Sequence, residues 1–67
     1  LQIRKHFVYA GHNYCAYIDL ASDGEAWFTI FDADEYGNAI DQPIYSYTVS
    51  SITDEELNRC IQEFVNN

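Results

Sequence analysis

A change of hydrophobic period near residue 53 most constrains what this chain can fold into. After it, apolar residues recur at the i, i+3, i+4, i+7 and i+8 spacing of an amphipathic helix: Leu57, Cys60, Ile61, Phe64 and Val65. Thr53 as N-cap and Glu56 three residues later form a capping box, and Ile52 with Leu57 is placed for a hydrophobic staple. The spacing predicts one C-terminal helix whose single apolar stripe needs a partner surface.

Before that point, aromatic and β-branched residues gather in four segments, as is typical of strands: 6–10, 14–20, 26–31 and 44–49. Gly11-His12 is expected to join the first pair, Ser22-Asp23-Gly24 the second, and a longer loop, 32–42, the third. Successive short connections favour an antiparallel meander. Pro43 has no backbone donor and best suits the beginning of the fourth strand or an edge of the sheet.

The predicted fold class is therefore α+β. We expect a four-stranded antiparallel meander with one C-terminal helix packed on one face of the sheet, because both elements have an apolar surface to cover. The 67 residues are enough for one small acidic domain, residues 1–67.

Alternation along the second and third predicted strands separates two faces of the sheet. One face is predicted to carry Ala16, Ile18, Leu20, Phe28 and Ile30. The other is predicted to carry Tyr17, Trp27, Phe31, Asp19 and Thr29. Since one helix covers only one face, we expect the aromatic face to be partly exposed, either shielding a thin sheet or paired with another molecule. Tyr45 and Tyr47 share a face of the fourth strand and would extend this patch if their register allows it.

Charge narrows the classes of partner. Between residues 19 and 56 there are ten carboxylates and no Lys or Arg, and the formal net charge is −8. Such a surface attracts basic proteins or cations and repels polyanions. Direct nucleic-acid binding is not expected, because only three Lys and Arg residues can neutralise phosphates. There is no membrane-spanning apolar run and no signal-peptide pattern, so we expect no membrane insertion and a cytoplasmic location.

Local structure explains most of the acids. Three of them are expected in the first helical turn, where their negative charges interact favourably with the positive end of the helix dipole: Asp54, Glu55 and Glu56. Glu55 is also spaced to pair with Arg59. A hairpin turn around Gly24 accounts for Asp23 and Glu25. The acids left without a structural reason lie in the third predicted loop: Asp32, Asp34, Glu35 and Asp41.

This loop begins like a calcium-binding EF-hand, whose first, third and sixth positions would be Asp32, Asp34 and Gly37. The ligands expected at positions five and twelve are replaced by Tyr36 and Pro43. A hairpin loop with Gly37 or Asn38 at positive φ explains the same residues. Weak divalent-cation binding by residues 32–41 stays an alternative, and no dedicated metal site or cofactor is expected.

Catalytic motifs are not found. The chain has no nucleophile elbow, no Gly-rich phosphate loop and no Cys-His-Asn order, so we expect no catalytic residues and no enzyme activity. His12 and Cys15 would point to opposite faces of a strand, which disfavours zinc. Cys15 and Cys60 are interpreted as small buried hydrophobic residues; the alternative, a disulfide, requires both on the same face of the sheet.

The function favoured by these features is a non-enzymatic interaction module that presents an acidic loop and an aromatic sheet face to a basic protein, such as a nucleic-acid-binding protein. In the sharpest version, the carboxylates imitate phosphates and the protein is a nucleic-acid-mimic inhibitor. The alternative is a self-associating accessory or structural protein, a homodimer through the aromatic face. The predicted contact residues are Asp32, Asp34, Glu35, Tyr36, Asp41, Trp27, Tyr45 and Tyr47.

Overall fold

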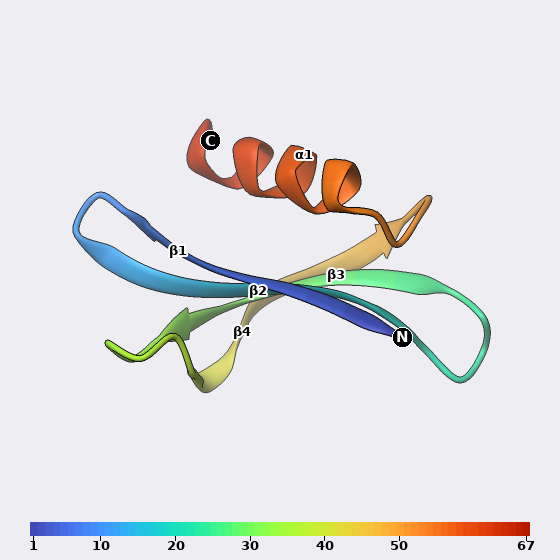
Figure 1. The fold of residues 1–67 in the computed structure, drawn as a ribbon, viewed down its shortest axis with the longest axis horizontal. Coiled ribbons are helices and arrows are strands. Elements are labelled where there is room, and N and C mark those ends of the chain that lie inside the picture. The colour runs from blue at the N-terminus through green and yellow to red at the C-terminus, as the bar shows by residue number, and fades with distance from the viewer.

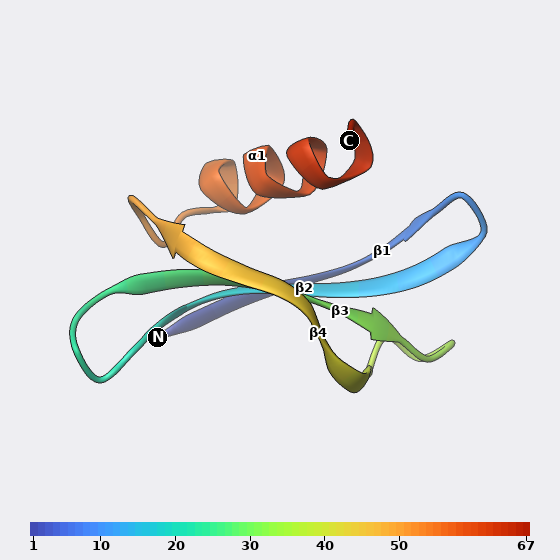
Figure 2. The ribbon, with the colours of Figure 1, turned by 180° about the vertical axis from the view of Figure 1, so that it is seen from behind.

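The computed structural model describes residues 1–67 as one antiparallel sheet followed by one helix (Figure 1). The sheet has the order β1-β2-β3-β4, and the helix α1 spans Asp54–Val65. The strand bounds are Gln2–Tyr9 for β1, His12–Leu20 for β2, Ala26–Ala33 for β3 and Ala39–Val49 for β4. The predicted α+β meander with one C-terminal helix on one face of the sheet is confirmed (Figure 2).

The first hairpin closes through a two-residue turn. Ala10 and Gly11 have φ values of 52° and 79°, and Tyr9 pairs with His12. Two successive positive φ angles are the mark of a type I′ turn, whose twist matches that of the flanking strands. His12 therefore belongs to β2 and not to the turn.

The third connection differs from the prediction. β3 and β4 pair as far as Ala33 and Ala39, so only residues 34–38 form the turn. The long loop predicted over 32–42 is wrong: Asp32 lies in β3 and Asp41 lies in β4. We call residues 33–39 the hairpin tip.

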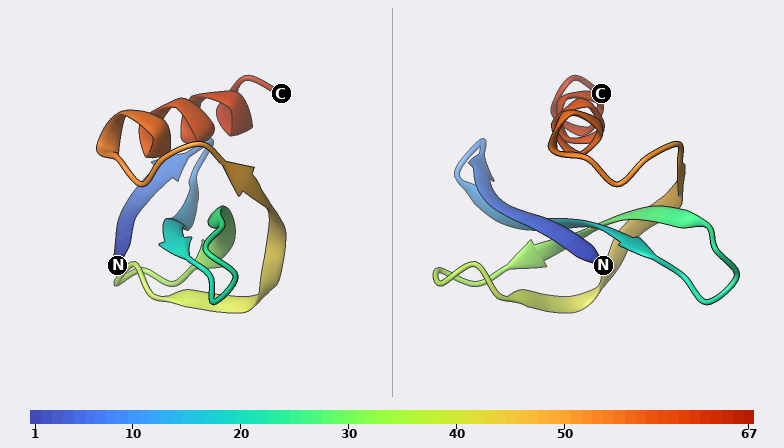
Figure 3. Two further views of the ribbon diagram at one scale, coloured as in Figure 1. Left: turned by 90° about the vertical axis from the view of Figure 1, so that its right-hand side faces the viewer. Right: turned by 45° about the vertical axis from the view of Figure 1, so that its right-hand side comes forward.

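β4 is sharply bent in its first half. Ile30 pairs with Tyr45 while Asp32 pairs with Ile40, so β4 residues 41–44 lie opposite a single residue of β3. Asp41 has a φ of 61°, and residues 41–44 include a proline, as suits a bulge that interrupts the ladder. Figure 3 shows β4 curving from below the other strands up toward the helix.

The core lies between α1 and the sheet. Its buried members are Ala16, Ile18, Phe28, Ile30, Leu57, Cys60 and Ile61. The predicted core face is confirmed except at Leu20, which is 52% exposed at the end of β2. The helix lies mainly over β1 and β2, so the part of this face that belongs to β4 is less covered.

The hairpin tip covers one end of the opposite face. Arg4 Nη2 donates a 2.9 Å hydrogen bond to the Gly37 carbonyl, and Gly37 lies directly against the His6 side chain. His6 pairs with Cys15, which is fully buried although it lies outside the helix-side core. Cys15 and Cys60 are free thiols on opposite faces of the sheet, so the disulfide alternative is wrong.

Candidate functional site

The structure divides the predicted contact residues between the two faces of the sheet and the hairpin tip. Tyr45 and Tyr47 pair with Ile30 and Phe28, which are core-face residues. Directly opposed residues of antiparallel strands share a face, so both tyrosines lie on the helix side. Trp27 lies on the other face. The expectation that Tyr45 and Tyr47 extend the Trp27 patch is wrong, because the bulge in β4 sets a register that the sequence does not reveal.

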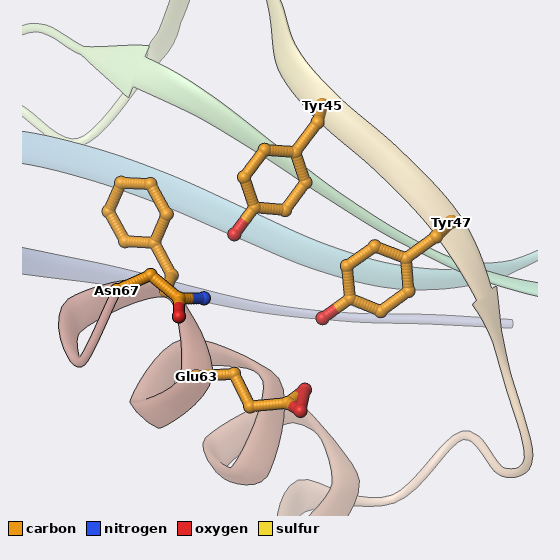
Figure 4. Close-up of a pocket in the computed structure, with 5 residues that line it drawn as sticks. Tyr45, Tyr47, Glu63 and Asn67 are labelled. Carbon is orange, nitrogen blue, oxygen red and sulfur yellow. The ribbon is translucent and has the colours of Figure 1, made fainter.

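An open groove separates β4 from the end of α1. It has a volume of about 540 Å³ and is lined by Tyr45, Tyr47, Glu63, Phe64 and Asn67. We call it the tyrosine groove. In Figure 4 both tyrosine hydroxyls point from β4 toward the helix, and the Glu63 side chain extends from the helix below the Tyr47 ring. The groove exists because α1 leaves β4 partly uncovered.

Aromatic packing holds this groove in shape. The Tyr45 and Tyr47 rings are stacked, with centroids 5.8 Å apart and planes at 19°. Tyr47 also packs against buried Phe28, at 5.3 Å between centroids, while Tyr45 lies 5.9 Å from the Phe64 ring. Tyr45 is still 36% exposed. One wall is therefore anchored on the core and offers aromatic surface to solvent.

The polar groups of the groove are neutral phenols and one carboxylate. Burial raises the pKa of both tyrosines, and the nearby Glu63 charge raises each pKa further, so the hydroxyls are protonated at neutral pH. Glu63 Oε1 accepts a 3.0 Å hydrogen bond from Arg59 Nη1, whereas Glu63 Oε2 accepts none from the chain. No Lys or Arg lines the groove. A cation entering it would meet aromatic rings and a carboxylate oxygen with spare acceptor capacity.

The opposite face carries a second, smaller hollow of about 280 Å³, lined by Gln2, Tyr17, Asp19, Trp27, Thr29 and Phe31. We call it the tryptophan pocket. Tyr17 meets Phe31 edge to face, with centroids 5.7 Å apart, and the Arg4 guanidinium lies 5.9 Å from the centroid of the Tyr17 ring. Trp27 is 36% exposed. The predicted partial exposure of this aromatic face is confirmed.

Asp34 is a turn residue and not a free surface charge. Its Oδ1 accepts hydrogen bonds from the backbone N–H groups of Tyr36 and Asn38, both at 2.9 Å. These bonds, chiefly the one from Asn38, lower the pKa of the Asp34 carboxyl. An Asp that folds back onto amides two and four residues later is ordinary turn chemistry. The short Asp-to-Asn spacing around Gly37 was the sequence signal for it.

The other predicted acids are dispersed. Asp32 pairs with Tyr14 and Ile40 near the end of the helix-side face, and Asp41 is exposed in the β4 bulge. Glu35 and Tyr36 are exposed at the hairpin tip, where 79% of Tyr36 is accessible. The four acids therefore do not share one loop: two lie in strands and two in the turn. No group of three or more His, Cys, Asp or Glu side chains is placed to hold a metal ion.

Glu56 is a buried carboxylate whose role in the capping box was predicted, but whose contacts with Ser50 and Arg59 were not. Its backbone N–H donates to Thr53 Oγ1 at 3.2 Å, which confirms that side of the capping box. Its carboxylate does not return to Thr53 but accepts hydrogen bonds from Ser50 and from Arg59, the shortest at 2.6 Å. Arg59 thus pairs with Glu56 and Glu63, and the predicted pair with Glu55 is wrong.

This network has a structural role. The hydrogen bond from Arg59, assisted by those from Ser50, lowers the pKa of Glu56 to about 2. Glu56 is consequently ionised at all physiological pH values and ties the beginning of α1 to the end of β4. It is not a candidate for general acid catalysis, which requires a pKa nearer the working pH.

Two further observations bear on identity. The single helix of this chain is neither long nor apolar enough to cross a membrane. Comparison with protein-family models, with curated proteins and with solved structures gives no match.

Proposed function

We propose that this protein is a non-enzymatic interaction module that binds a basic segment of a protein partner. The observation that carries the proposal is the tyrosine groove, an open hollow walled by stacked tyrosines and a glutamate on a chain of net charge −8. Aromatic faces attract ammonium and guanidinium groups, and a carboxylate adds a charge-assisted hydrogen bond. The two kinds of group together favour a basic side chain over an acidic one.

The acids outside the groove act at longer range. Glu35 at the hairpin tip and Asp32 near Tyr14 are exposed and belong to a field of one sign. Such a field raises the rate of encounter with a basic partner more than it strengthens the final complex. In the nucleic-acid-mimic version of this function, one of the four carboxylates, Asp34, already accepts two backbone hydrogen bonds of the turn.

A selection from random peptides tests the proposal. The immobilised chain is offered a phage-displayed library at low ionic strength, and the recovered sequences are synthesised and titrated. We expect enrichment in Arg and Lys, and an affinity that falls by about tenfold or more from low to physiological salt. The proposal would be contradicted if the recovered peptides held no excess of basic residues, or if their affinities did not change with salt concentration.

General attraction between opposite charges needs its own control. Each selected peptide is compared with a scrambled peptide of the same composition, which has the same charge but a different order of side chains. A module with a defined site distinguishes the two peptides. Equal affinity of the selected and scrambled peptides would show that binding is non-specific charge attraction, and the proposal would then be wrong.

A second candidate function, self-association, is supported by the tryptophan pocket. Trp27, Tyr17 and Phe31 expose aromatic surface on the face that carries no helix. A homodimer formed there would bury Trp27 and would not involve Tyr45, which lies on the other side of the sheet. Sedimentation velocity from low to high micromolar concentration tests this candidate function. A dimer that Trp27→Ala dissociates would support self-association, and a monomer at every concentration would exclude it.

A further inference from the structure

The outer edge of β4 is an unused hydrogen-bonding surface. β4 is the last strand of the sheet and pairs only with β3. None of the 8 backbone hydrogen bonds outside the regular elements involves residues 44–49. In an edge strand, every second residue directs its N–H and C=O groups outward, where another strand can pair with them.

This edge is regular over the segment that borders the tyrosine groove. Residues 45–49 pair with residues 26–30 in continuous register, and the bulge lies wholly before them. An added strand would lie about 4.8 Å outside β4 and would point alternate side chains to the helix side. A side chain in the right register would then enter the space between Tyr45, Tyr47 and Glu63.

Charge decides between the two edges of the sheet. The opposite edge, β1, carries Arg4 and Lys5, which are two of the three basic residues of the chain. The third, Arg59, already donates to both Glu56 and Glu63. A basic segment is therefore repelled at β1 and attracted at β4, where Glu63 lines the groove and the one nearby cation, Arg59, is shared between two carboxylates.

We propose that an extended, Arg- or Lys-containing segment of a partner protein adds to β4 as a fifth strand, with one basic side chain lying over Tyr45 and Tyr47 toward Glu63. Backbone hydrogen bonds along the edge supply affinity, and the groove selects the side chain. The apolar stem of Arg or Lys packs on the tyrosine rings while its charged head reaches the free carboxylate oxygen. This inference rests on the proposed function, since it names the partner's chemistry and its place.

The probe is a short synthetic peptide in which Arg alternates with Thr, so that all Arg side chains of the added strand share one face. In an NMR titration of the full chain we expect amide shifts centred on residues 44–49 and 63–67, and slower hydrogen exchange at alternate amides of β4. Shifts centred on the hairpin tip, on the tryptophan pocket or on β1 would overturn the inference.

Backbone methylation tests strand addition separately from side-chain binding. Two probe isomers are methylated on the backbone nitrogens of odd or of even residues, and only one of these sets faces β4. We expect one isomer to bind about tenfold or more weakly and the other to bind like the parent peptide. Equal loss, or no loss, in the two isomers would exclude pairing with the β4 edge.

Matched variants test the groove. Tyr45→Ala and Glu63→Gln should each weaken the probe by about five- to tenfold. Their controls remove the same kind of group elsewhere: Tyr9→Ala at the end of β1 and Glu55→Gln at the other end of α1, both exposed and both expected to change affinity less than about twofold. Because Glu63 is exposed, Glu63→Gln keeps the test valid even if Tyr45→Ala is poorly folded.

The outcomes distinguish a failure of the groove as the binding site from a failure of the proposed function. If the control variants weaken binding as much as the groove variants do, the groove is not the site, although a basic partner still binds. If neither this probe nor any selected basic peptide binds the parent protein, the proposed function itself fails.

Discussion

At the scale of single residues, Gly37 shows how the hairpin tip is fixed to β1. It has a φ of +85°, and a Cβ built on it would lie 2.9 Å from the Cγ and Nδ1 atoms of His6. His6 cannot easily yield, because its own Cβ, which the backbone of β1 holds in place, would lie only 3.1 Å from the added atom. The close approach therefore requires a residue without a side chain.

We predict that Gly37→Ala destabilises the fold more than Gly11→Ala does. Gly11 also has a positive φ, +79°, but nothing lies within 4 Å of its added Cβ. Gly11→Ala should cost about 1 kcal/mol for backbone strain alone, and Gly37→Ala about 1–3 kcal/mol more for the contact with His6. Urea unfolding of both variants measures the difference. Equal losses would mean that the tip is not held against His6.

Glu56 predicts a dependence of stability on pH. Hydrogen bonds from Arg59 lower its pKa from 4.5 to about 2 in the folded state. Because the folded pKa is lowered, this stabilisation is fully present above the unfolded pKa near 4.5 and is lost as the pH falls toward about 2. The free energy of unfolding should therefore decline across that window.

Replacing the carboxylate tests this assignment. We expect Glu56→Gln to be less stable than the parent near neutral pH, with a gap that narrows on acidification below about pH 4.5. Glu55→Gln is the control, because Glu55 is exposed in the same turn and receives no bond from Arg59. Urea titrations at several pH values supply the measurement. A gap independent of pH would assign the acid sensitivity to other carboxylates.

At the scale of elements, the β3–β4 hairpin depends on the Asp34 side chain. Asp34→Ala removes the acceptor of the Tyr36 and Asn38 amides. We predict that hydrogen exchange at these amides becomes about tenfold faster, because the turn opens more often. Glu35→Ala removes a neighbouring charge without removing a turn bond and should leave their exchange nearly unchanged. Equal acceleration in the two variants would show that Asp34 matters only by its charge.

The elements also show where sequence reasoning succeeds and where it stops. α1 was predictable because its signals are local: the Thr53 N-cap and the apolar spacing from Leu57 onward lie within one segment. The placement of Tyr45 was not predictable, since it depends on how many residues β4 inserts opposite Phe31. The alternation of side chains along a strand assigns residues to a common face but does not say which face of the sheet that is. A bulge inserts extra residues and so changes which residues share a face beyond it.

The same distinction applies to the candidate site. The sequence singled out both tyrosines of the groove but missed Glu63, because a helix residue joins a strand residue only through tertiary packing. The sequence-based interpretation also placed Asp34 among the acids with no structural reason. Asp34 in fact accepts hydrogen bonds from amides two and four residues away, which is local turn chemistry. The Glu63 contact depends on tertiary packing that a single sequence does not encode locally, whereas the Asp34 turn depends on neighbouring residues alone.

At the scale of the whole molecule, the charge acts over the full width of the fold. The principal extents are 34 × 23 × 17 Å, the net charge is −8, and the two salt bridges are both made by Arg59. The Debye length is about 30 Å at 0.01 M salt and about 10 Å at 0.1 M. At the lower concentration the carboxylates therefore repel one another across the molecule, and at the higher concentration they do not.

We predict that added salt stabilises this protein. Raising NaCl from about 0.01 M to about 0.1 M should increase the urea midpoint, because self-repulsion weakens the compact state more than the expanded chain. Glu35→Lys makes the net charge less negative by two at the exposed hairpin tip and should flatten the dependence. Urea is the suitable denaturant, since guanidinium is itself a salt. A midpoint that falls with NaCl would mean that the Arg59 ion pairs outweigh the repulsion, and that the acidic field is too weak at the surface to steer a basic partner.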